Sequence, residues 1–303
     1  MSIFRYFFKP GILAAMKNEV YFLLTKKKRR VILHLTFKLN VKCNVRIRYQ
    51  WIYRSVVHRR FSMTVSTLSI VCMAISALVT AGVFAALFCI LKIRFKQPWQ
   101  PFLAGCLTFL VTAMILEPAL HQVVLSSTAG TTIQSNIWLY GLYGAFAATL
   151  FEETGRFITM KFFLKKYHSQ DAAGIMYGAG HGGFEAFMLL GVTMISNIAV
   201  ALSVNSGTLA AQTAGLDAAS LSAVQTQVMQ LCTTPAWMYA LGIVERLFAI
   251  TAQIALSMLM WRGVVKTNVG YIALACAFHF FMDFVSVISS AFIGAVGTEI
   301  IIA

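Results

Sequence analysis

The feature that most constrains this chain is a series of long apolar runs. A helix needs roughly 20 mostly apolar residues to cross the hydrocarbon core of a bilayer. Six runs reach this length, at about 64–91, 101–124, 136–164, 171–203, 236–261 and 268–290. We therefore predict an all-α, polytopic transmembrane helix bundle with six spans. A further apolar run, 291–303, is too short to span; it is either a re-entrant or interfacial piece, or a seventh span cut short by truncation of the reading frame.

The overall composition supports a membrane protein. Hydrophobic residues make up 59% of the 303 residues and charged residues only 12%. Soluble domains contain about 25% charged residues. One water-soluble core cannot hide this much apolar surface, so we expect membrane lipid to surround the helices and a multi-pass location in the cell membrane.

The net charge of +15 belongs mainly to one end of the chain. Residues 1–62 hold 15 of the 25 Lys and Arg and one of the 10 acidic residues. Residues 63–303 therefore hold 10 basic and 9 acidic residues, a net charge of +1. We divide the chain into a basic N-terminal extension, 1–62, and a membrane domain, 63–303. A nearly neutral membrane domain argues against nucleic acid as its partner.

The loops predict the orientation. Basic residues follow the first, third and fifth spans, whereas loops 125–135 and 204–235 contain no Lys or Arg. Cytoplasmic loops are enriched in Lys and Arg, so the end before the first span should lie outside the cell. In loop 204–235, apolar residues recur at helical spacing, which predicts a short helix on the outer interface.

This orientation conflicts with the basic extension, because its 15 Lys and Arg would have to cross the membrane. One hypothesis is that translation starts at Met63, so that residues 1–62 are not part of the native protein. The alternative is a cytoplasmic arm followed by an inverted or re-entrant first span.

Ionisable residues inside the apolar runs are the second constraint. Each costs at least ~2.5–3.5 kcal/mol at a helix centre and usually faces the bundle interior, either pairing helices or serving function. Several are four residues apart and so share a helix face. The third span contains Glu152, Glu153 and Arg156; the fourth contains His181 and Glu185; the fifth contains Glu245, Arg246 and Gln253; the sixth contains His279 and Asp283.

These residues should lie at one depth. At a rise of 1.5 Å per residue, His181 is ~15 Å from the cytoplasmic end of its span, and His279 and Glu152 are at similar distances. We read Glu245 and Arg246 as an ion pair that stabilises the bundle, and Glu117 and His121 in the second span as interfacial or structural. The other residues predict a buried polar site in the cytoplasmic half of the bilayer, open to the cytoplasm.

The chemistry of this set suits hydrolysis. A buried carboxylate can act as a general base on water, and a histidine can orient the water or stabilise an oxyanion. Alternatively His181, His279, Asp283 and one glutamate could hold Zn²⁺, which would acidify the water. No HExxH motif occurs, which excludes a zincin-type site.

At these residues the sequence resembles the YhfC family of bacterial intramembrane peptidases, which is distantly similar to the CAAX-processing and bacteriocin-processing membrane proteases. The resemblance rests on Glu152 to Arg156, Gly180 to Glu185, Glu245-Arg246, and His279 to Asp283, and it covers most of 63–300. In the wider group a double glutamate precedes an arginine, an aromatic residue precedes one histidine by four, and a second histidine precedes Asn or Asp by four.

The resemblance implies an intramembrane protease acting on a peptide or membrane-protein substrate. It implies that Glu152 or Glu153 activates water with His181, and that His279 and Asp283 bind the oxyanion or a metal. Two residues separate the double glutamate from Arg156 here, whereas the wider group has three. Which glutamate is the base therefore stays open. The alternatives to a peptidase are a proton-coupled transporter that uses the same relay, or a non-catalytic membrane protein.

Overall fold

The computed structural model describes residues 64–292. The proposed extension 1–62 and the apolar run 291–303, except for its first two residues, lie outside the described residues. Within 64–292, all regular elements are helices. They are α4 Thr67–Cys89, η1 Ile90–Arg94, α5 Gln100–Val111, η2 Thr112–Leu116, α6 Glu117–Leu125, α7 Thr128–Ser135, α8 Ile137–Ile158, η3 Thr159–Phe163, η4 Lys165–Tyr167, α9 Ala172–Ala186, η5 Phe187–Val192, α10 Thr193–Asn205, α11 Leu209–Gln212, α12 Ala218–Thr233, α13 Ala236–Val265 and α14 Val269–Phe292.

Five continuous helical stretches are long and apolar enough to cross a membrane, which makes this a polytopic helical membrane protein. They are Thr67–Arg94, Gln100–Leu125, Ala172–Asn205, Ala236–Val265 and Val269–Phe292. The remaining predicted span, 136–164, is also helical, as α8 and η3. It does not qualify by composition, because charged side chains fall within its last turns.

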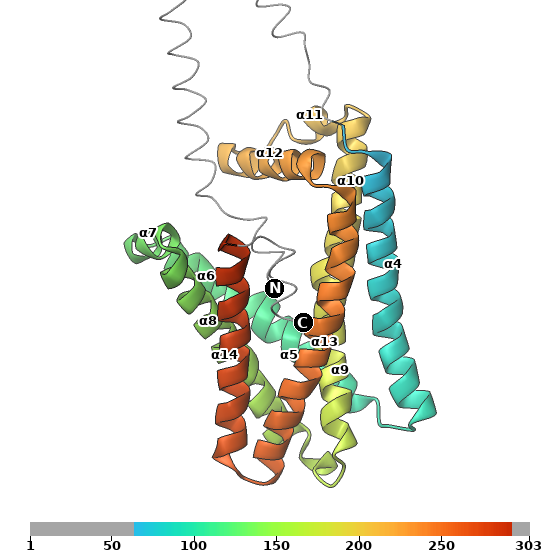
Figure 1. Ribbon diagram of the computed structural model, residues 1–303, viewed down its shortest axis with the longest axis vertical. Helices are drawn as coiled ribbons and strands as arrows, with labels where there is room; N and C mark the ends of the chain where they lie inside the picture. Colours follow the sequence, from blue (N-terminus) through green and yellow to red (C-terminus); the bar gives the residue numbers. More distant parts are fainter. Residues whose placement is uncertain (1–63, 293–303) are drawn as a thin grey trace, which may run out of the picture. The chain divides into compact units, whose positions relative to one another are not determined.

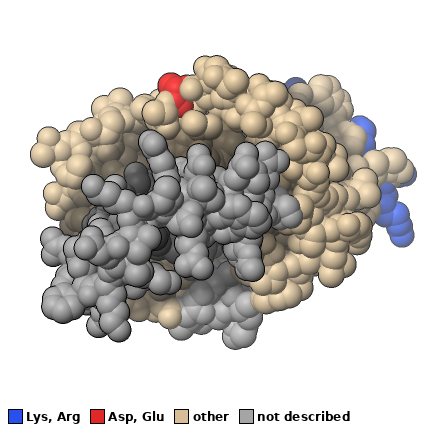
Figure 2. All heavy atoms as spheres, turned by 90° about the horizontal axis from the view of Figure 1, so that it is seen from above, with Lys and Arg blue, Asp and Glu red and all other residues tan. Residues whose placement is uncertain are grey.

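The helices alternate in direction, and the basic loops share one end of the bundle (Figure 1). The loop after η1, the segment after α8 and the turn between α13 and α14 all lie at the lower end in that view. At the opposite end α12 lies across the top of the bundle, as the sequence predicts. Seen from that end, basic side chains appear only at one margin of the described surface (Figure 2). The lower end therefore has the charge of a cytoplasmic face.

Polar residues at the helix starts explain where several elements begin. The side chain of Asn136 accepts hydrogen bonds from the backbone N–H groups of Trp138 and Leu139 at the start of α8. Asp217 does the same for Ala219 and Ser220 at the start of α12. Such caps satisfy N–H groups that have no partner within the helix.

The glycines of α9 allow two neighbouring helices to approach its backbone. A Cβ atom at Gly180 would overlap the backbone of Phe102 in α5, and one at Gly178 would lie 2.8 Å from the Cα of Ile254 in α13. Small residues at helix contacts are typical of membrane bundles. Both glycines therefore serve close helix packing.

The helices α13 and α14 have different neighbours in the half of the bundle that lies near α12. There α13 packs on α4, where the Ser76 hydroxyl donates to the Tyr239 carbonyl over 2.8 Å. In contrast, α14 packs on α8, with Phe284 against Gly141. Figure 1 shows the two helices separating in that direction. Where α13 and α14 converge, with α8 and α9 beside them, the ionisable residues gather.

Candidate active site

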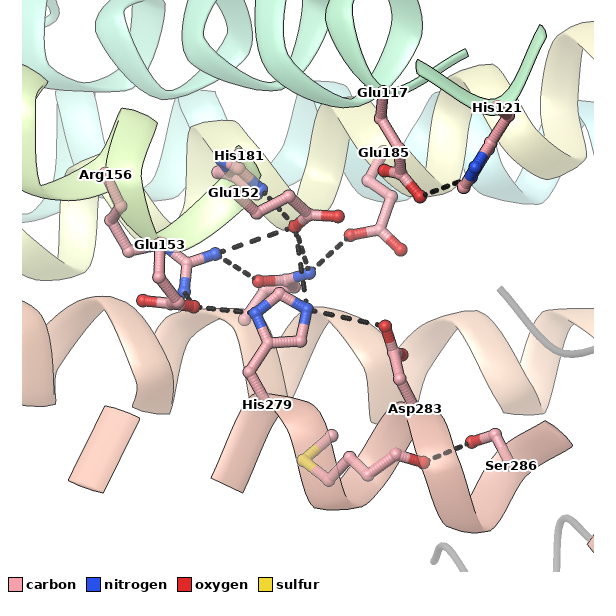
Figure 3. Close-up of polar contacts among 12 residues, drawn as sticks. Glu117, His121, Glu152, Glu153, Arg156, His181, Glu185, His279, Asp283 and Ser286 are labelled. Carbon is pink, nitrogen blue, oxygen red and sulfur yellow. Dashed lines mark hydrogen bonds and ion pairs between the residues drawn. The ribbon is translucent and has the colours of Figure 1, made fainter. Parts of the chain in front are cut away.

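Four helices contribute to one buried polar cluster (Figure 3). We call it the central cluster and define it as Glu152, Glu153, Arg156, His181, Glu185, Glu245, Arg246, Gln253, His279 and Asp283. All but Asp283 are buried. The sequence predicted one polar site from Glu152, Glu153, His181, Gln253, His279 and Asp283, and a separate ion pair from Glu245 and Arg246. The structure joins that ion pair to the site through Glu185. Whether the cluster opens to the cytoplasm is not tested by these contacts and stays a prediction.

The two adjacent glutamates of α8 point to different histidines. Residues next to each other on a helix are about 100° apart, so Glu152 and Glu153 face different neighbours. An oxygen of Glu152, Oε2, lies 3.1 Å from Nε2 of His181 in α9. In contrast, Oε1 of Glu153 lies 2.7 Å from Nδ1 of His279 in α14. The double glutamate therefore connects α8 to two different helices.

Arg156 pairs mainly with Glu153. Its Nη1 donates to Glu153 Oε1 over 2.5 Å, whereas its Nη2 is 3.9 Å from Glu152 Oε2. The spacing of four residues suggested Glu152 as the local partner of Arg156. The i,i+3 pair has the shorter contact here, so Arg156 interacts more strongly with the charge of Glu153 than with that of Glu152.

Gln253 of α13 joins three charged side chains. Its carbonyl oxygen accepts a hydrogen bond from Arg156 Nη2 over 2.5 Å. Its amide nitrogen donates to Oε2 of Glu152 over 3.2 Å and to Oε2 of Glu185 over 2.7 Å. The amide thus occupies a position between two carboxylates that come from different helices.

Glu185 links α9 to the ion pair of α13. Arg246 Nη1 donates to Glu185 Oε1 over 3.1 Å, and its Nη2 contacts Glu245. The Glu245–Arg246 pair expected from the sequence is therefore present and extends to Glu185. Glu185 lies just before η5, a π-helical segment, and such segments frequently occur at functional sites.

His279 faces both Glu152 and Asp283 with its second ring nitrogen. Nε2 lies 3.9 Å from Glu152 Oε2 and 3.8 Å from Asp283 Oδ2. Because Nδ1 contacts Glu153, a neutral ring that donates from Nδ1 has its Nε2 lone pair directed at the centre of the cluster. A carboxylate partner of this kind is usual for metal-ligating histidines.

The rings around His181 are mostly apolar. Phe109 of α5 packs edge-on against His181, with ring centroids 5.4 Å apart, and Tyr177 lies 6.0 Å away. Tyr177 is the aromatic residue four positions before His181, as in the motif of the wider protease group, whereas no sequence motif includes Phe109. A phenylalanine in an apolar helix has no feature that distinguishes it from its lipid-facing neighbours.

Several polar atoms of the central cluster have no hydrogen-bond partner in the described structure. They include Glu152 Oε1, Glu153 Oε2 and Nδ1 of His181. Four buried carboxylates face two guanidinium groups, so four negative and two positive charges leave an excess of two negative charges if all are ionised. Buried polar groups without partners are rare and call for an explanation. A divalent cation, or bound protons, would balance this charge.

The residues present fit such a cation. Ligand atoms of Glu152, His181 and Glu185 all lie within 4.8 Å of one another. One nitrogen and two carboxylates are donors that Zn²⁺ accepts, and a catalytic zinc site commonly has three protein ligands. The compact group includes Glu185, whereas the sequence favoured His279 and Asp283 as ligands. Of these two, His279 lies with its Nε2 3.9 Å from Glu152 Oε2.

A second, smaller polar group lies outside the central cluster. We call it the outer cluster and define it as Glu117, His121 and Tyr143. His121 contacts Glu117 Oε1 through Nε2 over 3.0 Å and the Tyr143 hydroxyl through Nδ1 over 2.8 Å. Both ring nitrogens are therefore in use, as expected for a structural group.

Known proteins with similar sequences match the part of the chain that contains the central cluster. The family model described as YhfC intramembrane metalloprotease matches residues 75–302, which include the whole central cluster. A Bacillus subtilis (strain 168) protein named "Uncharacterized membrane protein YhfC" is 36% identical over 203 residues, which cover 66% of this chain and 77% of that protein. No solved structure matches the chain. The resemblance predicted from the sequence motifs is thus confirmed: this multi-pass membrane protein belongs to the YhfC intramembrane metalloprotease family.

Proposed function

We propose that this protein is an intramembrane peptidase that hydrolyses a peptide bond at the central cluster. The observation that supports this most strongly is the group of Glu152, His181 and Glu185, three buried side chains from two helices with ligand atoms within 4.8 Å. Family membership agrees with this activity. The substrate would be a peptide segment that enters the membrane domain.

Glu152 is the glutamate best suited to activate water. Its Oε2 contacts His181 and Gln253, while its Oε1 is buried without a hydrogen-bond partner. Oε2 can therefore hold the carboxylate within the central cluster while Oε1 accepts a proton from the attacking water. The proton would then pass to the nitrogen of the leaving amine as the peptide bond breaks.

Glu153 has a different role in this proposal. It is held by Arg156 and contacts Nδ1 of His279. This fixes the His279 ring so that Nε2 faces Glu152 and Asp283. His279 can then contact the developing oxyanion or act as a further ligand, and Asp283 would orient it.

Glu152, His181 and Glu185 would hold a divalent cation such as Zn²⁺, with His279 as the next candidate ligand. A bound Zn²⁺ would polarise the peptide carbonyl and lower the pKa of a bound water molecule. The remaining residues, Arg156, Glu245, Arg246 and Gln253, would keep the carboxylates in place and balance part of their charge.

The test is cleavage of membrane peptides by the purified full chain in detergent or liposomes. Glu152→Gln and His181→Ala should each reduce the rate by roughly 10²–10⁴-fold, as expected for loss of an acid–base group. His121→Phe, in the outer cluster, is the matched control and should cleave normally. Folding of each variant is checked by thermal melting.

Normal cleavage by both Glu152→Gln and His181→Ala would remove this site assignment. If no preparation cleaves peptides and the protein instead drives proton-coupled solute uptake into liposomes, it is a carrier that uses the same residues.

A further inference from the structure

Gln253 is the one uncharged and non-titrating side chain among the ten members of the central cluster. It is 7% exposed and lies in the middle of α13. Its position is set by close packing with α9, since a Cβ atom at Gly182 would lie 2.7 Å from the Cβ of Gln253. The two helices therefore hold the amide at a fixed height beside His181 and Glu185.

The orientation of the amide follows from its partners. A guanidinium group can only donate hydrogen bonds, so Arg156 Nη2 must face the carbonyl oxygen of Gln253. The NH₂ group is then directed at the two carboxylates, with one contact to Glu152 and one to Glu185. Each of its two hydrogens serves a different helix.

The bridged carboxylates belong to the group with metal-ligand spacing. Two carboxylates this close repel each other, and a low local dielectric strengthens that repulsion. A neutral donor between them favours their approach without adding charge. A cation would do the same, so the amide and the cation act on the same pair of carboxylates.

We propose that Gln253 is a positioning residue that holds Glu152 and Glu185 at ligand spacing before a divalent cation binds. This inference rests on the proposed function, because it assumes that the cation binds to Glu152, His181 and Glu185. Gln253 itself touches neither the cation nor the substrate in this assignment.

Two substitutions separate positioning from packing. Gln253→Leu has a similar size but removes all three hydrogen bonds. Gln253→Glu keeps the shape and can still accept from Arg156, but it replaces the donor with a third carboxylate. Gln227→Leu is the matched control, because Gln227 bridges α12 to α10 by a 3.0 Å hydrogen bond to Asn197, away from the central cluster.

The experiment uses the full chain in detergent, stripped with a chelator and titrated with Zn²⁺ or Co²⁺. The readouts are the melting temperature and the visible absorption spectrum of bound Co²⁺. Gln253→Leu should bind the ion about 10- to 100-fold more weakly than the wild type, the usual effect of losing a partner of a metal ligand. Without the ion, Gln253→Glu should have a lower melting temperature than the wild type. Adding the ion should raise the melting temperature of Gln253→Glu by more than it raises that of the wild type. The Gln227→Leu control should match the wild type in both readouts.

If both Gln253 variants show the wild-type affinity, spectrum and ion-induced rise in melting temperature, Gln253 serves packing alone and the inference fails. If the wild type itself binds neither ion, the cation part of the proposed function fails as well. Should Gln253→Leu not fold, the isosteric Gln253→Glu still decides.

Discussion

The two polar groups in this bundle differ in how well their atoms are satisfied. In the outer cluster each nitrogen of His121 has its own partner, Glu117 on one side and Tyr143 on the other. In the central cluster, carboxylate oxygens and Nδ1 of His181 are buried without a hydrogen-bond partner in the described structure. Carboxylates also outnumber guanidinium groups there.

This difference distinguishes a polar group that stabilises the fold from one that can serve a function. A satisfied buried network stabilises and orders the helices that it joins. A network with surplus negative charge and unused acceptors is costly by itself, and such cost is tolerated at sites where a ligand or a proton completes it. By this criterion the outer cluster joins α6 to α8, and the central cluster is the one to which we assign the proposed reaction.

The largest expected effect comes from removing divalent cations. Treatment of the purified protein with a strong chelator should reduce peptide cleavage by at least about 100-fold if the proposed cation is bound, because a catalytic metal ion contributes several kcal/mol of transition-state stabilisation. Adding Zn²⁺ back should restore the rate. His121→Phe should show the same loss and the same recovery, because the outer cluster takes no part in cation binding. Chelator-resistant cleavage would instead favour a mechanism in which Glu152 and His181 act alone.

The next prediction compares two arginine–carboxylate pairs. Arg246 is buried with Glu185 and Glu245, so Arg246→Met should lower the free energy of unfolding by about 3–5 kcal/mol, since it leaves buried carboxylates without their cation. Arg262 pairs with Asp171 over 2.8 Å, but their side chains are 40% and 55% exposed. Arg262→Met should therefore cost only about 0–1 kcal/mol. Thermal melting in detergent measures both, and equal losses would contradict the assigned burial.

A third prediction exchanges charge for an amide in each cluster. Glu117→Gln weakens a satisfied contact with His121 and should cost about 1–3 kcal/mol of stability while cleavage continues. Glu152→Gln removes surplus buried charge, so it should leave the stability unchanged or raise it while cleavage is lost. Opposite outcomes, a destabilised Glu152→Gln and an inactive Glu117→Gln, would reverse the roles of the two clusters. Melting and cleavage assays on the same preparations decide.

The positions of these residues could be predicted from the sequence, but most of their partners could not. Apolar run lengths and a rise of 1.5 Å per residue placed Glu152, His181 and His279 at one level, since both depend only on helix geometry. The rule that residues four apart share a face then suggested His181–Glu185 and His279–Asp283 as pairs. In the structure Glu185 instead bonds to Gln253 and Arg246.

The reason is that partner choice depends on neighbouring helices. The shortest contact of His279 is with Glu153 in α8, and Asp283 lies 3.8 Å away on its own helix. Side-chain rotamers and the rotation of each helix about its axis decide such contacts, and a single sequence encodes neither directly. The same holds for Phe109, which helix packing alone brings against His181.

The smallest expected effect concerns Asp217, a carboxylate that is satisfied in a third way. It caps α12 and accepts hydrogen bonds from the backbone N–H groups of Ala219 and Ser220 and from the Ser220 hydroxyl. The hydrogen bond from the Ser220 N–H, followed by that from its hydroxyl, holds the pKa of Asp217 below its ordinary value of 3.8. A carboxyl group with a lowered pKa stabilises the folded state above its unfolded pKa, and this contribution is lost as the pH falls through the folded value.

We therefore expect the start of α12 to loosen only below about pH 4. Pepsin, which is active in this range, should then cut the wild type near Leu216 and Leu221 severalfold faster below about pH 4 than at pH 5. The rate at each pH is divided by the rate for Asp217→Asn, which removes the pH dependence of pepsin itself. An asparagine also caps helices but does not titrate here, so this variant should lack the change with pH. Ion binding at the central cluster, measured at neutral pH, should be identical in Asp217→Asn and the wild type. A change in that binding would mean that α12 and the central cluster are coupled. The carboxylate of Asp217 would then not be independent of the carboxylates of the central cluster.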